Sequence, residues 1–116
     1  MKVYGVSQTS GQERRLYVER GAHGVVLTIK DRDGAKELAR VLVRPDDLLP
    51  AVTDPGPGGW TVEGTSPAHG WKVLLGVEVR RNEVWLSARP AAGAATDVAV
   101  GLDDFQDALE GAIGQA

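Results

Sequence analysis

Two stretches of the chain repeat one pattern of residues, and this repeat constrains the fold more than any other feature of the sequence. The segment Leu16–Glu19 recurs as Leu75–Glu78, 59 residues further on. Further along, the spacing falls to 57, so that Asp46–Leu48 corresponds to Asp103–Phe105. The two-residue difference arises between positions 30 and 40, in an expected turn, where a duplication can lose residues at little cost.

Within each copy, apolar and polar residues largely alternate over short runs, which is the pattern of half-buried β-strands. Strands are expected at residues 3–8, 16–18, 25–29 and 38–43 in the first copy, and at 60–65, 72–80, 83–89 and 97–101 in the second. Tight turns separate neighbouring strands, so we expect an antiparallel sheet. The Pro-Asp-Asp step at 45–47 indicates a short helix, and an apolar stripe indicates another from about Asp103 to Ile113.

The repeat predicts an α+β fold made of two tandem ββββα repeats. Each unit alone would expose the buried face of its sheet, so we expect the two to pack as a pseudo-dimeric, antiparallel, β-rich single domain. The expected boundaries are 1–54 for the first repeat, 55–59 for a Pro/Gly linker and 60–116 for the second repeat. At 116 residues the chain suits one compact domain, since two separate domains would lack core.

Composition excludes several functional classes. The chain has no cysteine, which excludes disulfides, thiolate metal sites and a cysteine nucleophile. Its two histidines, His23 and His69, lie in expected turns without metal-ligand spacing, and its serines lack a nucleophile-elbow context. We therefore expect a non-enzyme with no cofactor and no metal. No apolar run approaches the roughly 18–20 residues that span a bilayer, and no signal-peptide pattern is present, so we expect a cytoplasmic protein without a membrane partner.

Alternation also assigns the strand residues that point away from the core. On this outward face, basic residues outnumber acidic ones and two aromatic residues, Tyr17 and Trp85, are present, although the whole chain carries a net charge of −3. Most other carboxylates fall at helix starts and in turns. Such a face suits a single-strand binder, because bases stack on aromatic rings at about 1–3 kcal/mol each while Lys and Arg follow the phosphates.

In Val41–Leu48 an expected strand is followed by a proline and two aspartates, which begin an expected helix, and residues 98–105 show a similar pattern. A four-strand sheet followed by a helix, used twice, resembles the single-stranded nucleic-acid-binding fold of positive-cofactor-four-type transcriptional coactivators, Pur proteins and plant Whirly proteins. In the coactivator type, the last strand also passes through a proline-acidic step into an amphipathic helix. The resemblance implies binding of single-stranded DNA or RNA through the sheet.

We therefore predict a non-enzymatic single-stranded DNA- or RNA-binding domain in which Tyr17 and Trp85 stack on bases. The predicted binding residues are Arg15, Tyr17, Thr28, Lys30, Arg40, Arg44, Lys72, Arg80, Trp85 and Arg89. Three alternatives stay open: an ordinary polar sheet surface, a protein-interaction module such as an adaptor, immunity-type protein or regulatory subunit with a protein partner, and a small-molecule binder or enzyme. Trp60 and Trp71 fit either core capping or an interaction surface. A monomer and a homodimer are both compatible with the sequence.

Overall fold

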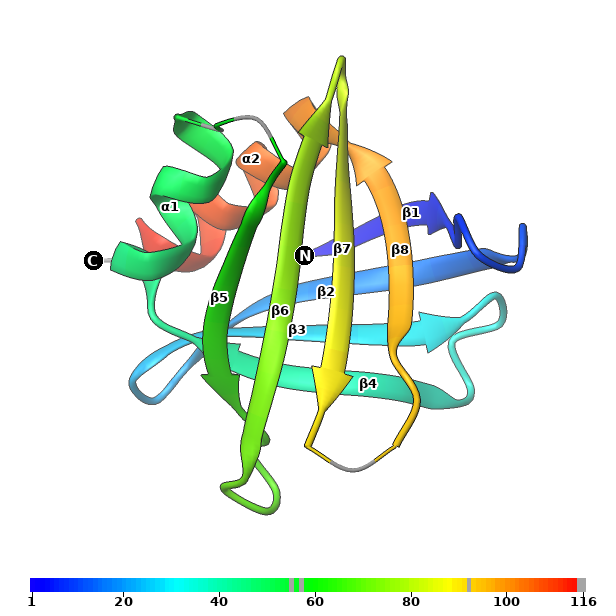
Figure 1. Cartoon of the computed structure of the whole chain (residues 1–116), viewed down its shortest axis with the longest axis horizontal. Coiled ribbons are helices and arrows are strands. Elements are labelled where there is room, and N and C mark those ends of the chain that lie inside the picture. The colour runs from blue at the N-terminus through cyan, green and yellow to red at the C-terminus, as the bar shows by residue number, and fades with distance from the viewer. Residues whose placement is uncertain (55, 57, 92, 115–116) are drawn as a thin grey trace.

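The computed structural model describes residues 1–54, 56, 58–91 and 93–114, so Pro55 and Pro57 of the predicted linker lie outside the described residues. Figure 1 shows the arrangement of the elements. In chain order they are β1 (Lys2–Val6), β2 (Glu13–Gly21), β3 (Gly24–Asp31), β4 (Glu37–Val43), α1 (Pro45–Thr53), β5 (Trp60–Thr65), β6 (Lys72–Arg80), β7 (Glu83–Pro90), β8 (Thr96–Gly101) and α2 (Leu102–Ile113).

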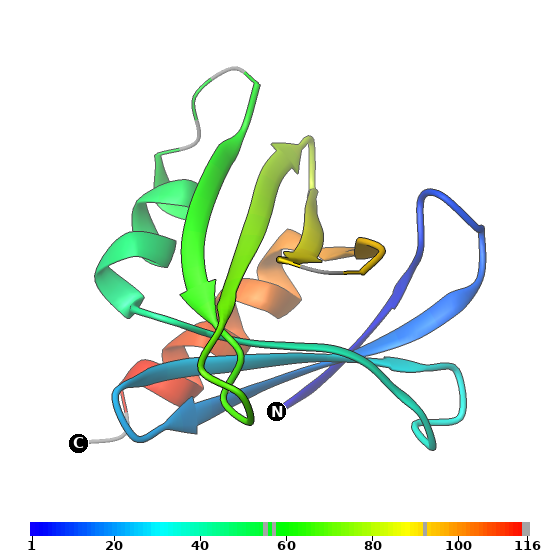
Figure 2. The same ribbon diagram turned by 60° about the horizontal axis from the view of Figure 1, so that its bottom comes forward.

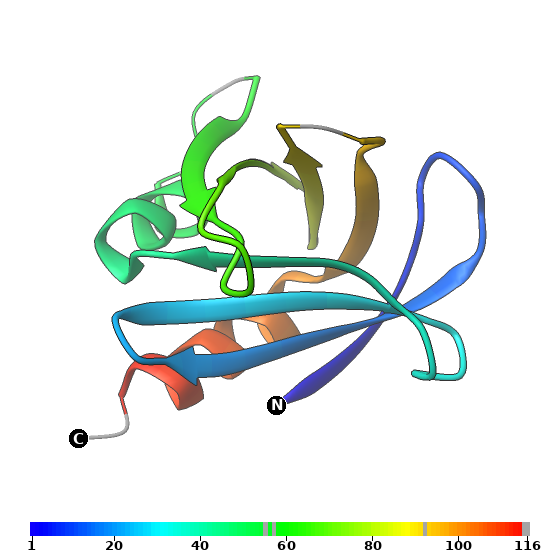
Figure 3. The ribbon, with the colours of Figure 1, turned by 90° about the horizontal axis from the view of Figure 1, so that it is seen from below.

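The strands form a closed barrel in which each strand pairs antiparallel with its neighbours in sequence and β8 returns to pair with β1. Two seams in this barrel are short. At one seam Leu42 of β4 pairs with Thr65 of β5, and at the other Gly5 and Val6 of β1 pair with Val100 and Ala99 of β8. The barrel therefore consists of two well-paired walls, β1–β4 and β5–β8, which cross one another and face each other across the core (Figures 1 and 3).

The predicted fold class is wrong. We expected an α+β pseudo-dimer of two tandem ββββα repeats, whereas the strands of both segments form one closed antiparallel barrel with two short helices. The physical reason lies in the sheet edges: a four-stranded sheet leaves a row of unpaired backbone groups on each edge strand, and closure pairs these edges with each other. Alternation reports which side of a strand is buried, but it does not report which edges meet.

Glycines allow the strands to meet at both seams. A β-carbon on Gly5 would collide with the carbonyl oxygen of Ala99 on β8. A β-carbon on Gly64 of β5 would lie 2.6 Å from the carbonyl oxygen of Leu42 on β4. Both glycines are thus required by the close approach of a neighbouring backbone, a common reason for glycine inside a strand.

The β1–β8 seam is reinforced by the carboxylate of Asp97 on β8. One carboxylate oxygen accepts hydrogen bonds from the hydroxyls of Ser7 and Thr9 at 2.8 and 2.7 Å, and the other accepts one from the backbone N–H of Gln8 at 2.7 Å. The guanidinium of Arg14 on β2 lies 3.5 Å from the same carboxylate. Burial acts to raise the pKa of Asp97, but these hydrogen bonds outweigh burial and leave the pKa below its usual value. The carboxylate therefore ties the β1–β2 turn to β8.

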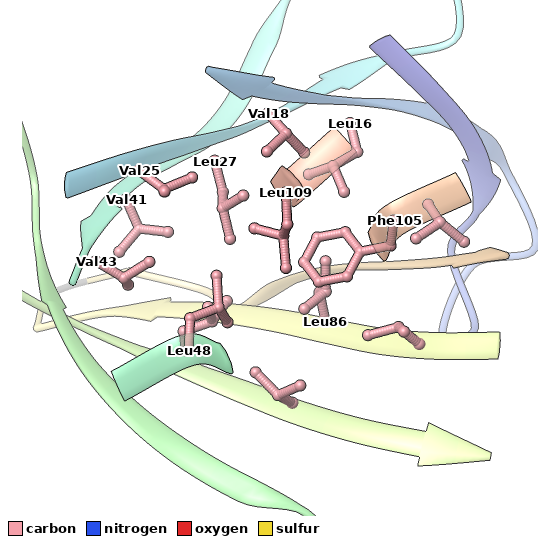
Figure 4. Packing of buried hydrophobic residues seen from close by; sticks show 14 of the residues in the cluster. Leu16, Val18, Val25, Leu27, Val41, Val43, Leu48, Leu86, Phe105 and Leu109 are labelled. Carbon is pink, nitrogen blue, oxygen red and sulfur yellow. The ribbon is translucent and has the colours of Figure 1, made fainter. Parts of the chain in front are cut away.

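Apolar side chains from both walls and both helices fill the barrel. The two helices lie on the same side of the molecule (Figure 2), and Leu48 of α1 and Phe105 and Leu109 of α2 point in among the strand residues (Figure 4). These three side chains are 1% exposed or less. Leu27 of β3 and Leu86 of β7 belong to the same core, since they are 2% and 1% exposed. The helices thus complete the core that the strands alone would leave open.

Candidate nucleic-acid interface

The ten predicted binding residues lie in three places on the barrel. Arg15, Tyr17, Thr28, Lys30 and Arg40 belong to β2–β4, whereas Lys72, Arg80, Trp85 and Arg89 belong to β6 and β7, and Arg44 follows β4 directly. Four steps around the ring separate β2 from β6 and β3 from β7. Contrary to the expectation of one binding face, closure therefore turns the two groups toward opposite sides of the molecule.

Thr28 does not belong to an accessible surface. It lies between Tyr17 of β2 and Arg40 of β4 in the register of the sheet. Its side chain points outward, but the longer neighbouring side chains cover it, and Thr28 is only 2% exposed. Direct contact between Thr28 and a ligand therefore requires its neighbours to move.

Trp85 is also partly covered, by a side chain of its own wall. The guanidinium carbon of Arg80 lies 3.9 Å from the centre of the indole ring, within the range of a cation–π contact. Arg80 is held there by an ion pair with Glu78 at 3.0 Å. The indole Nε1 is shielded from water and has no hydrogen-bond partner among the described residues. A base can stack on the covered part of this ring only by displacing Arg80.

The outer surface of β1–β4 carries two rows of basic and aromatic side chains. In the first row, Lys2 of β1 pairs with Tyr17 of β2, and the row continues through Thr28 to Arg40. In the second row, Tyr4 of β1 pairs with Arg15 of β2, which pairs with Lys30 of β3. Paired side chains on one face of a sheet stand about 5 Å apart, so each tyrosine has cations as direct neighbours.

Tyr4 is the exposed aromatic residue of this wall, and the sequence-based prediction missed it. It is 64% exposed, with the Lys2 ammonium 5.4 Å and the Arg15 guanidinium carbon 5.6 Å from the ring centre. The second tyrosine, Tyr17, is half-buried, and the Lys30 ammonium lies 4.9 Å from its ring centre. Lys30, one of the predicted binding residues, is itself half-buried. The Lys2-Val3-Tyr4 pattern was the signal that could have placed Tyr4 outward.

Arg15 is oriented by Tyr17 and lies beside the turn between β3 and β4. A side-chain hydrogen bond with Tyr17 is the main reason that the pKa of Arg15 is raised above its usual value, and the negative charge of Asp33 adds to the effect. Gly34 passes over this pair with a φ of +73°, and a β-carbon there would lie 2.7 Å from the Arg15 Nη1. Arg15 is thus a positioned cation beside Tyr4, and Gly34 is the residue that leaves room for it.

Two neighbouring grooves extend this surface past the end of the wall. The first, of about 500 Å³, is lined by residues that include Tyr4, Arg15 and Arg32. The second, of about 620 Å³, shares Arg14 and Arg32 with the first and reaches Lys36. Exposed acidic partners are present as well, because Glu13 lies 3.5 Å from Arg32. The lining of both grooves also includes Glu13 and Asp33, and that of the second includes Asp31, so the grooves carry both charges.

Charge is distributed unevenly between the β1–β4 segment and the rest of the chain. Residues 1–44 contain nine Lys/Arg and five Asp/Glu, whereas residues 45–116 contain four and eleven. The net charge of −3 for the whole chain therefore conceals a segment with a positive balance. Because phosphate groups are recognised mainly through nearby cations, the β1–β4 wall is the candidate interface for an anionic chain.

Two other kinds of feature, metal centres and membrane-spanning helices, are not found in the part of the chain that the structure describes. No group of three or more His, Asp or Glu residues there could hold a metal ion. None of the helices formed by these residues is long and apolar enough to cross a membrane. The comparisons with known proteins find no matching family model, no matching curated protein and no matching solved structure. The resemblance to the coactivator, Pur and Whirly proteins therefore stays a prediction.

Proposed function

We propose that the outer surface of β1–β4 binds single-stranded DNA or RNA. The observation that carries this proposal is Tyr4, which is 64% exposed and has the Lys2 and Arg15 cations 5.4 and 5.6 Å from its ring centre. An exposed ring on a sheet can stack on any of the four bases, and neighbouring cations neutralise the phosphates on either side of the stacked base. This combination favours binding with little sequence preference.

The surroundings of Tyr4 support a binding path across the wall. Lys30 and Arg40 lie on β3 and β4, so a strand that stacks on Tyr4 can place its phosphates along the two rows described above. Arg15 is already oriented by Tyr17, and this preorganisation lowers the entropy lost on binding. In the other direction, Arg32 lines the groove next to Tyr4 and provides a further phosphate contact.

The proposal is tested by titrating a fluorescein-labelled, mixed-sequence oligonucleotide of about 20 nucleotides and following its anisotropy. Wild-type affinity should fall as salt rises, because bound phosphates release counterions. Tyr4→Ala should weaken binding by about 1–3 kcal/mol, or roughly 5- to 150-fold, the range for loss of one base stack. Trp71→Ala is the matched control, since Trp71 is 56% exposed but lies in the turn between β5 and β6.

The charge component is tested separately with the double variant Lys2→Gln, Lys30→Gln. For single strands, each phosphate contact contributes about 0.7 to the slope of log K against log salt. The double variant should therefore flatten this slope by about 1.4 if both lysines contact phosphates. Absence of binding at high micromolar protein and low salt, or an equal loss of affinity in the Tyr4 and Trp71 variants, would contradict the proposal.

A second candidate function, a protein-interaction module, is favoured by the exposed Trp71. Its ring lies 4.3 Å from that of His69 in the same turn, and tryptophan is enriched among the residues that dominate protein interfaces. This function predicts a stoichiometric complex with a protein that is lost in Trp71→Ala and retained in Tyr4→Ala. Size-exclusion chromatography of the three proteins with that partner distinguishes the two functions.

A further inference from the structure

The strand β5 keeps an open edge on the side that faces β4. Of the residues of β5, Thr65 pairs with Leu42 of β4, and the rest of β5 lies at the edge of its wall, next to α1 (Figure 1). No described residue pairs in the sheet with Thr61 or Glu63 on this side, and both are exposed. The edge of β5 is therefore accessible to a further strand.

The register of β6 and β7 shows where the backbone groups of this wall point. The two-residue turn at 81–82 is closed by the pair of Arg80 and Glu83, which exchange backbone hydrogen bonds in a turn of this length. Hydrogen-bonded and non-hydrogen-bonded pairs alternate along antiparallel strands. Arg80 therefore bonds to β7, and Val77, three residues earlier, directs its N–H and C=O groups toward β5.

The same alternation continues across β5. Trp60 pairs with Val77, so the backbone groups of Trp60 point to β6. The next residue, Thr61, and after it Glu63, then direct their N–H and C=O groups away from β6, toward the open edge. Each of these residues thus offers one donor and one acceptor to a strand placed beside β5.

A groove of about 350 Å³ follows this edge. We refer to it as the β5 edge groove. It is lined by residues of α1 and of β5, namely Asp46, Asp47, Pro50, Trp60, Thr61, Val62 and Glu63. This lining contains three carboxylates and no Lys or Arg. The β5 edge groove therefore differs in charge from the grooves beside the β1–β4 wall.

Two of these carboxylates are not neutralised by the protein. Glu63 forms an ion pair with Lys72 at 3.3 Å, whereas Asp46 and Asp47 form no ion pair with any described residue. Both aspartates lie in the first turn of α1 and are exposed. A ligand that carries Lys or Arg side chains complements this charge.

Trp60 adds an aromatic surface to the groove. Because Trp60 pairs with the buried Val77, its side chain lies on the core side of β5, and it lines the groove together with Pro50 of α1. At the first position of β5 it remains 42% exposed. An exposed indole attracts a Lys or Arg cation to its face and packs against the aliphatic stem of the same side chain.

We propose that the open edge of β5 binds an extended peptide that carries Lys or Arg side chains. The peptide backbone adds a strand to the wall and exchanges hydrogen bonds with Thr61 and Glu63. Alternate side chains of the added strand face α1, where the two aspartates and Trp60 receive the cations. This site does not depend on the single-strand binding proposed above, since it lies on β5 and α1.

The test follows the anisotropy of a fluorescein-labelled peptide of about six residues in which Lys and Val alternate. Saturable binding that weakens as salt rises is expected, and a peptide in which Glu and Val alternate should bind at least about tenfold more weakly. A Lys–Val peptide with methylated backbone nitrogens should not bind, because it has lost its backbone donors. Among the three indole N–H resonances, that of Trp60 should shift most.

Two variants test the backbone and the charge separately. Thr61→Pro removes one N–H from an edge strand, where proline is tolerated, and should weaken binding at least about fivefold; Thr61→Val keeps this N–H and is the matched control. The double variant Asp46→Asn, Asp47→Asn should weaken binding about threefold or more at low salt. Its matched control is Asp103→Asn, Asp104→Asn, since these residues lie in the first turn of α2.

Several results would overturn this proposal. They are equal affinity for the Lys–Val and Glu–Val peptides, undiminished binding of the methylated peptide, equal effects of the two double variants, and wild-type affinity in a Thr61→Pro variant that melts as wild type does. Concentration-dependent dimerisation that Thr61→Pro abolishes would show that a second copy of the chain occupies the edge, which would also overturn it. Tyr4→Ala should leave peptide binding unchanged, because Tyr4 lies on β1.

Discussion

Replacing Asp97 with asparagine should open the β1–β8 seam, because this carboxylate binds the β1–β2 turn with three hydrogen bonds. The asparagine side chain keeps one acceptor oxygen and has an NH₂ group in place of the other. This NH₂ group, itself a donor, then lies opposite a hydrogen-bond donor of the β1–β2 turn and cannot accept its hydrogen bond. Hydrogen bonds to a charged group contribute about 1.5–3 kcal/mol each. Ser7 is only 1% exposed, and its hydroxyl can find few other partners. We therefore expect a loss of about 2–4 kcal/mol in the free energy of unfolding.

The same substitution should change the response of stability to acid. The pKa of Asp97 in the folded protein lies below its value of 3.8 in the unfolded chain. The stabilising effect of the carboxylate is therefore fully present above the unfolded pKa and is lost as the pH falls through the folded pKa. The difference in stability between wild type and Asp97→Asn should be greatest near neutral pH and should shrink as the pH falls below about 4.

Urea denaturation followed by circular dichroism, at pH 7 and at several acidic pH values, measures both effects. Asp107→Asn is the matched control, because Asp107 is exposed on α2 and undergoes the same chemical change. The control should stay within about 0.5 kcal/mol of wild type, as surface substitutions usually do. Equal stability of Asp97→Asn and wild type at pH 7, or a difference that persists unchanged in acid, would refute the role assigned to this carboxylate.

Further variants test the core, the second seam and the Arg15 site. Leu27→Ala should cost about 2–5 kcal/mol of unfolding free energy by urea titration, and less than about 0.5 kcal/mol would contradict its place in the core. Gly64→Ala should cost at least about 1 kcal/mol by the same assay, because its β-carbon would lie 2.6 Å from a carbonyl oxygen. Gly111→Ala, where a β-carbon meets open space on α2, should be neutral or slightly stabilising, since alanine favours a helix more than glycine does. Gly34→Ala should destabilise the fold by about 1 kcal/mol, since it places a side chain at positive φ. It should also weaken oligonucleotide binding by displacing Arg15, and unchanged affinity would show that Arg15 is not part of the interface.

The local elements of this protein could be predicted from its sequence, and the closure of the barrel could not. The expected strands at 60–65 and 72–80 agree with β5 and β6 to the residue, because the alternation of apolar residues has the period of a strand. Closure depends on which backbone edges meet, at Gly5 and at Gly64. Nothing in the alternating pattern distinguishes a glycine that is required by the close approach of a neighbouring strand from a glycine that has no such steric role.

The candidate site was predicted in part, for a related reason. Alternation placed Arg15 and Tyr17 outward on one strand, and both belong to the proposed interface. It also grouped Trp85 with them. Alternation shows only that a side chain points away from the core, and it does not show that the outward side chains of β2 and β7 lie on opposite sides of the barrel. The contacts that cover Trp85 and Thr28 come from neighbouring side chains, and such cover depends on packing rather than on periodicity.

Mapping of the oligonucleotide contact by backbone amide chemical shifts is the most direct test of the proposed function. ¹⁵N-labelled protein is titrated with an unlabelled single strand of about 20 nucleotides at low salt. We predict that the largest shifts occur at Tyr4, Arg15 and Lys30, on β1–β3, and that the amides of β6 and β7 remain unperturbed. Shifts centred on β6 and β7, or no saturable shifts at millimolar strand, would contradict the assignment of single-strand binding to the β1–β4 wall.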